Sequence, residues 1–177
     1  MDPKRGYAKT EWERRFLLAR FPIEASVVRV RRITDDYIEN TNLRLREQSE
    51  GQNHTVFKLT QKLAEETGSA RRELVTTIYV TREEFSVLTK LPARILQKTR
   101  FSVPPFGIDV FEGQLSGLVL AEAEFSSAAE ASALVIPSFV EQEITNDHRF
   151  TGGSLVAASR SEIQHLLAEY KIPCELL

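Results

Sequence analysis

The sequence has few of the residues that build many common functional sites. Of its 177 residues, one is a cysteine, Cys174, and three are histidines. A single thiol excludes an internal disulfide and a cysteine metal cluster, which favours a reducing compartment. The histidines His54, His148 and His165 do not have the spacing of a metal site. Carboxylate, lysine and arginine side chains are therefore the main candidates for any chemistry.

Long apolar runs and a strong net charge are also lacking. No run approaches the roughly 18 apolar residues that a membrane-spanning helix needs. The formal net charge is -2, so no overall basic field favours nucleic acid or an anionic membrane as a partner. The first residues, MDPKRGYAKTEWERR, contain no apolar signal core. We therefore expect a cytoplasmic protein that binds neither nucleic acid nor membrane.

What the sequence does contain is an alternation of apolar and polar residues, which is typical of strands. The length, with 42% hydrophobic and 27% charged residues, predicts a single globular domain over 1–177. The alternating segments are 10–18, 26–33, 40–47, 55–63, 72–80, 94–101, 107–113, 117–126 and 139–145. This number of segments predicts an antiparallel barrel or a large sheet.

Three capping-box patterns predict helix starts. They are Thr81 with Glu84, Ser127 with Glu130, and Ser159 with Glu162. The last pattern opens a helix at about 160–171. This helix has an apolar stripe made of Ile163, Leu166, Leu167 and Tyr170. The stripe predicts packing against a core rather than a binding surface.

Several predicted strands carry charge of one sign on one face. In TEWERRFLL, Glu11 and Glu13 share a face with Arg15, because alternate residues of a strand point to the same side. The two carboxylates would lie roughly 7 Å apart and would need a cation. Similar pairs are Arg44 with Arg46, Lys58 with Lys62, Lys98 with Arg100, Glu122 with Glu124, and Glu141 with Glu143.

Any one such pair is compatible with the solvent face of a half-exposed strand. As a set, the segregated pairs favour a ligand that is both anion and metal. Carboxylates alone prefer hard divalent cations such as Mg²⁺ or Mn²⁺. Clustered arginine and lysine side chains suit phosphate oxygens. A closed barrel could hold both groups in its interior, where the lower dielectric strengthens each contact.

In order along the chain, seven motifs resemble those of the CYTH, or triphosphate tunnel metalloenzyme, superfamily. They are EWERR at 11–15, LRLR at 43–46, KLTQK at 58–62, RRE at 71–73, KTRF at 98–101, IDVFEGQLSGLVLAEAEF at 108–125 and EQEIT at 141–145. The first is similar to the family's E-x-E-x-K, and the sixth to its D-x-F-x-G-x-x-x-G-L-x-x-x-E-x-E. The resemblance covers about residues 10–158.

The resemblance implies an α+β, mainly β, fold, which is an eight-stranded antiparallel β-barrel (the triphosphate tunnel) with helices packed outside. It implies Mg²⁺ or Mn²⁺ as cofactor and a small triphosphate compound as substrate. The implied metal ligands are Glu11, Glu13, Glu122, Glu124 and Glu143. The implied phosphate-binding residues are Arg44, Arg46, Lys58, Lys62, Arg71, Lys98 and Arg100. Arg15 and Tyr37 take the implied catalytic positions, and Glu73 and Asp109 are further tunnel residues.

Two departures from the family pattern bear on the substrate. Arg15 stands where the family usually has lysine, and an arginine cannot deliver a proton, which favours phosphate binding there. The family's Y-S-N near the end reads FTGG at 150–153. We expect metal-dependent hydrolysis of a triphosphate, with inorganic tripolyphosphate first. A class IV-type adenylate cyclase, a thiamine or nucleoside triphosphatase, and a non-catalytic polyphosphate- or nucleotide-binding protein remain alternatives, as do monomer and dimer.

Overall fold

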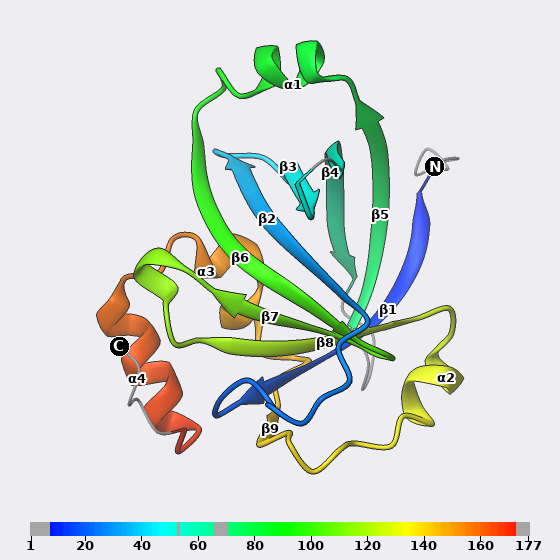
Figure 1. Cartoon of the computed structure of the whole chain (residues 1–177), viewed down its shortest axis with the longest axis vertical. Helices are drawn as coiled ribbons and strands as arrows, with labels where there is room; N and C mark the ends of the chain where they lie inside the picture. The colour runs from blue at the N-terminus through cyan, green and yellow to red at the C-terminus, as the bar shows by residue number, and fades with distance from the viewer. Residues whose placement is uncertain (1–7, 53, 66–70, 173–177) are drawn as a thin grey trace.

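The computed structural model describes residues 8–52, 54–65 and 71–172, without the side chains of residues 64, 65, 71 and 72 (Figure 1). The strands are β1 (Lys9–Leu18), β2 (Arg29–Ile38), β3 (Leu43–Glu50), β4 (His54–Glu65), β5 (Arg71–Val80), β6 (Ala93–Val103), β7 (Phe106–Phe111), β8 (Val119–Phe125) and β9 (Gln142–Glu143). The helices are α1 (Arg82–Leu88), α2 (Ala128–Ser132), α3 (Gly152–Leu155) and α4 (Arg160–Glu169), with short 3-10 turns η1 (Gly113–Leu115) and η2 (His148–Phe150). Cys174 lies outside the described residues.

The sheet closes into an eight-stranded antiparallel barrel, as the family resemblance predicts. The strand order is β5-β4-β3-β2-β6-β7-β8-β1-β9, and an additional pairing of β5 with β1 closes the circle. Strand β1 shares one edge between two partners. Its first half pairs with β5, where Glu11 lies opposite Glu73, and its second half pairs with β9, where Phe16 lies opposite Glu143. Its other edge pairs with β8 from Trp12 to Leu18.

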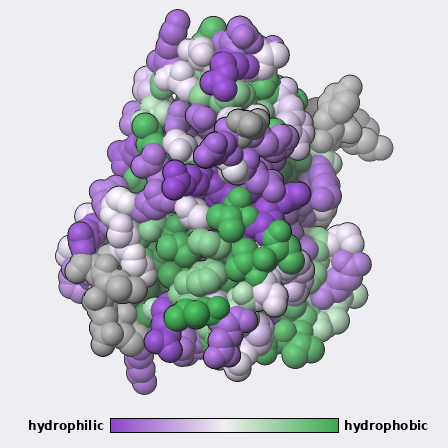
Figure 2. All heavy atoms as spheres, in the orientation of Figure 1, coloured by the Kyte–Doolittle hydropathy of each residue, from purple (hydrophilic) through white to green (hydrophobic). Residues whose placement is uncertain are grey.

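Helices pack outside the barrel, and α4 covers one end of it. Ile163 and Leu167 of α4 are buried in a cluster that also contains Phe111, Leu118 and Phe150. This confirms that the predicted stripe packs on the core. Figure 1 shows α3 and α4 together beside the loop that joins β7 and β8, whereas α1 lies at the far end of the barrel. In the same view, Figure 2 shows polar residues over the upper half and a group of apolar residues over the lower half.

Two capping boxes form as predicted. At Thr81 and at Ser159 the hydroxyl accepts from the backbone N–H three residues later, and the glutamate there accepts from the cap residue's N–H. The third box is half formed. Ser127 accepts from the Glu130 N–H, but the Glu130 carboxylate accepts from the Ser126 N–H instead. None of the described helices is long and apolar enough to cross a membrane.

Three predicted strands differ from the observed ones by three residues or more at one end. The segment predicted at 40–47 is displaced to Leu43–Glu50. The segment predicted at 26–33 begins at Arg29 and continues to Ile38, because it pairs on both edges, with β3 and with β6. The segment predicted at 139–145 contains only two strand residues, Gln142 and Glu143, because pairing with β1 is limited to the length that β5 leaves uncovered. The final helix ends at Glu169 rather than at 171, and Lys171 follows it with a φ of 57°.

Candidate active site

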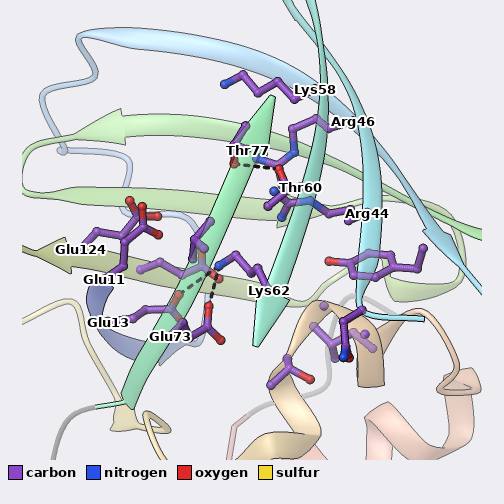
Figure 3. Close-up of a pocket in the computed structure, with 18 of the residues that line it drawn as sticks. Glu11, Glu13, Arg44, Arg46, Lys58, Thr60, Lys62, Glu73, Thr77 and Glu124 are labelled. Carbon is purple, nitrogen blue, oxygen red and sulfur yellow. Dashed lines mark hydrogen bonds and ion pairs between the residues drawn. The ribbon is translucent and has the colours of Figure 1, made fainter. Parts of the chain in front are cut away.

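A cavity of about 510 Å³ lies inside the barrel, and charged side chains line much of it (Figure 3). Among the described residues, the cationic ones are Arg15, Arg44, Arg46, Lys58, Lys62, Lys98 and Arg100. The anionic ones are Glu11, Glu13, Glu73, Glu122 and Glu124. The period-two alternation of the strands produces this arrangement, because every second residue faces inward.

The carboxylates all come from three neighbouring strands, which form what we call the acidic wall: β8, β1 and β5. Across the strand pairs, Glu13 lies opposite Glu124, and Glu11 lies opposite Glu73. Figure 3 shows Glu11 beside Glu124, and Glu13 beside Glu73 and Lys62. Like charges on directly opposite residues repel, so this wall carries unfavourable electrostatic energy unless cations offset it.

Glu13 carries most of that electrostatic strain. It is 7% exposed, and burial raises its pKa to about 7, with further upward contributions from Glu122 and Glu73. Two cations oppose the rise. Lys62 Nζ lies 3.8 Å from Glu13 Oε2, and Arg15 Nε lies 3.0 Å from Oε1. The Arg15 contact is electrostatic rather than a hydrogen bond, because that Nε is buried without a hydrogen-bond partner in the described part.

The basic wall is the part of the cavity lined by β3, β4 and β6, and buried carboxylates hold its arginines. Asp35 of β2 is fully buried and accepts from Arg46 Nε at 2.6 Å and Nη2 at 2.7 Å. Burial alone would raise the pKa of Asp35, but Arg46 and Arg44 hold it well below its usual value. Arg44 Nε lies 3.5 Å from Asp35 Oδ1 and is buried without a hydrogen bond to any described residue.

Asp109 of β7 has the same role for β6. It is fully buried, and its carboxylate accepts from Lys98 Nζ at 2.5 Å and from Arg100 Nε at 2.6 Å. Arg100 also pairs with Glu122. Burial would raise the pKa of Glu122, but Arg100 and Lys98 outweigh it and hold that pKa below its usual value. Two strands of the basic wall, β3 and β6, are thus braced by a carboxylate of a neighbouring strand.

Arg15 and Tyr37 both line the cavity, in different settings. Arg15 is 1% exposed, and its Nη2 donates to the carbonyl oxygens of Thr145 at 3.0 Å and Asp147 at 3.3 Å. These contacts tie β1 to the segment before α3. Burial raises the pKa of the Tyr37 phenol, so it stays protonated at neutral pH.

Comparison with known proteins identifies the chain. No model of a known protein family matches it. An inorganic triphosphatase of Nitrosomonas europaea is 36% identical over 154 residues, which span 82% of this chain and 96% of that protein. The chain belongs to the triphosphate tunnel metalloenzyme, or CYTH, superfamily.

Two solved structures are similar to this chain in fold. The inorganic triphosphatase NE1496 has a TM-score of 0.55 and 27% identity, covering 84% of this chain and 95% of its own. A second structure, of the hypothetical protein NE1496, has a TM-score of 0.55 and 29% identity, covering 84% and 99%.

Most residues that the sequence suggested for this tunnel protein come together in the cavity, with three exceptions. Asp109 lies behind the lining, where it holds Lys98 and Arg100. Arg71 opens β5, but its side chain is outside the described part of the chain. Glu143 lies outside the cavity lining and accepts from Arg14 Nε at 2.9 Å and Nη2 at 2.6 Å. Arg14 is turned outward because it alternates with the inward-facing Glu13 and Arg15.

Sequence reasoning missed Asp35 as part of the tunnel site. The predicted strand ended at Ile33, so Asp35 and Tyr37 were not counted among its inward-facing residues, although the strand continues to Ile38. The signal was present, because Ile33, Asp35 and Tyr37 follow the same period of two. A lone carboxylate between apolar residues lacks the paired pattern that revealed the other residues.

The carboxylates of the tunnel fit a divalent cation in their chemistry. Glu11 and Glu124 face the cavity from paired strands, and oxygen ligands of this kind suit Mg²⁺ and Mn²⁺. The raised pKa of Glu13 is the response of a buried carboxyl among other carboxylates, and a nearby cation would lower it. Among the described residues, no three carboxylate, imidazole or thiol groups already converge as a formed metal site. Binding a cation would therefore require these side chains to turn toward it.

Proposed function

We propose that the cavity binds a triphosphate compound and hydrolyses it with the help of Mg²⁺ or Mn²⁺, with inorganic tripolyphosphate as the first candidate. The observation that carries this proposal is the basic wall. Three of its cations, Arg46, Lys98 and Arg100, are fixed in the cavity by Asp35 and Asp109, at 2.5 to 2.7 Å. The 36% identical inorganic triphosphatase supports the same substrate class.

The donors left over on the basic wall suit phosphate oxygens. Asp35 occupies Nε and Nη2 of Arg46, and Asp109 occupies the same two nitrogens of Arg100. In the described part of the chain, Nη1 of each has no hydrogen-bond partner. Arg44 Nε, which lies 3.5 Å from Asp35 Oδ1, is buried without a hydrogen bond there as well. A buried N–H without an acceptor is costly, and a phosphate oxygen would relieve that cost.

The acidic wall would hold the cation, with Glu11 and Glu124 as its first ligands and Glu13 and Glu122 near them. When bound, such a cation supplies charge neutralisation and activation of water. The chain's own residues orient the triphosphate between the two walls and exclude bulk water from it. They also hold the positive charges in place before the reaction begins, so no free energy is spent on reorienting them during the reaction.

The proposed reaction is the hydrolysis of one phosphoanhydride bond. A water oxygen forms a bond to phosphorus while the bridging P–O bond breaks, and the electron pair of that bond leaves with the diphosphate. The water loses one proton, and the products are phosphate and diphosphate. Lys98 and Arg100 would stabilise the charge that develops on the leaving group, because both face the cavity and are held by Asp109.

The test is phosphate release from tripolyphosphate with Mg²⁺, with Mn²⁺ and with a chelator. ATP and thiamine triphosphate serve as parallel substrates, and the ATP reaction is also assayed for cyclic AMP. We expect metal-dependent phosphate release that is fastest with tripolyphosphate. Tight binding of tripolyphosphate without phosphate release under either metal would contradict the enzyme and favour a binding protein. Cyclic AMP from ATP would make the protein a cyclase.

A further inference from the structure

Gly152, the first residue of α3, is in unusually close contact with Tyr37. A Cβ atom added at Gly152 would lie 1.8 Å from the Tyr37 hydroxyl oxygen and 2.8 Å from Cζ. Real Cβ atoms essentially never approach within 3.0 Å of another heavy atom. The Tyr37 hydroxyl therefore occupies the space that a side chain at residue 152 would need. Both residues line the cavity.

Space rather than backbone conformation explains why glycine is needed here. Gly152 is not among the glycines with positive φ, which are Gly51, Gly113 and Gly117. The next residue, Gly153, is also in α3, and a Cβ there would have nothing within 4 Å. An alanine should therefore be accommodated at 153 but not at 152 without movement of Tyr37 or of the backbone.

The segment around Gly152 is firmly held, so Tyr37 is the group that would move. Thr151 caps α3 by accepting from the Ser154 N–H, and the Leu155 N–H donates to the Thr151 carbonyl oxygen at 2.8 Å. Phe150 and Leu155, on either side, are each 1% exposed and packed in the core with α4. Pushing this segment outward would disrupt that core.

We propose that Gly152 is a positioning residue, whose missing side chain allows the Tyr37 hydroxyl to face the bound triphosphate. The inference rests on the proposed function and deepens it. No described residue forms a hydrogen bond with the Tyr37 hydroxyl. Arg44, whose Nε also lacks a hydrogen bond there, lies opposite Tyr37 across the β2–β3 pair. A neutral phenol and a guanidinium that converge on one region suit a phosphate oxygen or the water beside it.

The experiment compares Gly152→Ala with its neighbour Gly153→Ala. In Gly152→Ala, we expect kcat for tripolyphosphate to fall about 10- to 100-fold, as for a reacting group misplaced by about 1 Å. KM should change much less. Gly153→Ala should keep both parameters within about twofold, because its new methyl group contacts nothing. Thermal unfolding of both variants checks that the barrel is intact.

Tyr37→Phe provides the second arm, because it removes the atom nearest to the added Cβ. Tyr37→Phe should itself lower kcat, and adding Gly152→Ala to it should cost no more than about threefold further, since the hydroxyl is already gone. Equal losses from Gly152→Ala with and without the hydroxyl would overturn the proposal. So would full activity in Gly152→Ala.

A readout that does not need turnover separates this inference from the proposed function. The chain has four tyrosines, so the Tyr37 ring signal in an NMR spectrum can be assigned with Tyr37→Phe. It should shift in Gly152→Ala and stay in place in Gly153→Ala, and tripolyphosphate should perturb it in the wild type and in Gly153→Ala but much less in Gly152→Ala. If the wild type does not release phosphate but these two effects occur, only the hydrolysis proposal fails. If neither effect occurs, the positioning role is wrong.

Discussion

The two walls of the cavity differ in how their charges are compensated. On the basic wall, Asp35 and Asp109 lie behind the cations and pair with them, so arginine and lysine side chains are held in place before any ligand binds. On the acidic wall, carboxylates face carboxylates across the strands, and the pKa of Glu13 rises to about 7. The difference fits the proposed function, in which the phosphate side is preformed and the acidic side would be completed by a cation from solution.

The largest effect is expected from removing a charge of the acidic wall. Glu11→Gln or Glu13→Gln should lower the metal-dependent kcat at least about a hundredfold, because the cation would lose a ligand. Glu141→Gln is the matched control, since Glu141 is exposed and outside the cavity lining. Initial rates over a metal titration measure the effect. Full activity in both cavity variants would show that Glu11 and Glu13 are not metal ligands.

The basic wall should lose stability when a bracing carboxylate is removed. Asp109→Asn leaves Lys98 and Arg100 without their buried partner, and breaking such a pair costs about 3 to 5 kcal/mol. Asp35→Asn should behave similarly through Arg46. Asp36→Asn is the control, because Asp36 has no ion pair in the described part and burial raises its pKa. Urea unfolding at pH 7 measures all three, and equal midpoints would contradict the bracing role.

The acidic wall should also make stability depend on pH in the absence of metal. The pKa of Glu13 is about 7 in the folded protein and ordinarily 4.5. Below pH 4.5 both states carry the proton. Between pH 4.5 and 7 only the unfolded chain releases it, so the wild type loses up to about 3 kcal/mol of stability over this range. Glu13→Gln should lack this loss, and the two proteins should be compared in chelator at pH 5 and pH 8. Parallel pH profiles would show that the pKa of Glu13 is not raised.

The smallest effect is expected outside the walls. Glu143→Gln weakens the partly exposed pair with Arg14, which is worth about 1 kcal/mol or less. Its Oε1 can still accept from the Thr145 hydroxyl, as Glu143 does at 2.6 Å. Its kcat and its metal concentration for half-maximal activity should stay within about twofold of wild type, since the structure places Glu143 off the cavity. A tenfold rise in the metal concentration needed for half-maximal activity would instead show that Glu143 is a metal ligand.

The sequence predicted the cavity lining well where charges come in pairs on one strand. The two members of each pair, such as Glu11 with Glu13 or Arg44 with Arg46, point to the same side of their strand, because a period of two fixes which side each residue takes. Closure of the barrel followed from the resemblance rather than from the pattern, which allowed an open sheet as well. The packing of α4 followed from its stripe, because burial of such a stripe requires a core beside it.

The remaining features depend on information that strand periodicity does not contain. Asp35 and Asp109 are single carboxylates, and their roles follow from which cation the neighbouring strand places against them. Glu143 belongs to a two-residue strand, too short for periodicity to decide its face. The contact of Gly152 with Tyr37 joins residues far apart in the chain, and only the folded backbone shows that they compete for the same space.

The shared edge of β1 also has a consequence for folding. β1 is among the first described residues, yet it pairs with β8 and β9 near the end of the barrel, where Glu13 meets Glu124. Contacts between residues this distant in sequence form late and slow the folding of β-proteins. A nascent chain must therefore leave the β8 edge of β1 unpaired until residue 125 has emerged. The appearance of metal binding during refolding is then expected to report closure of the barrel rather than its first hairpins.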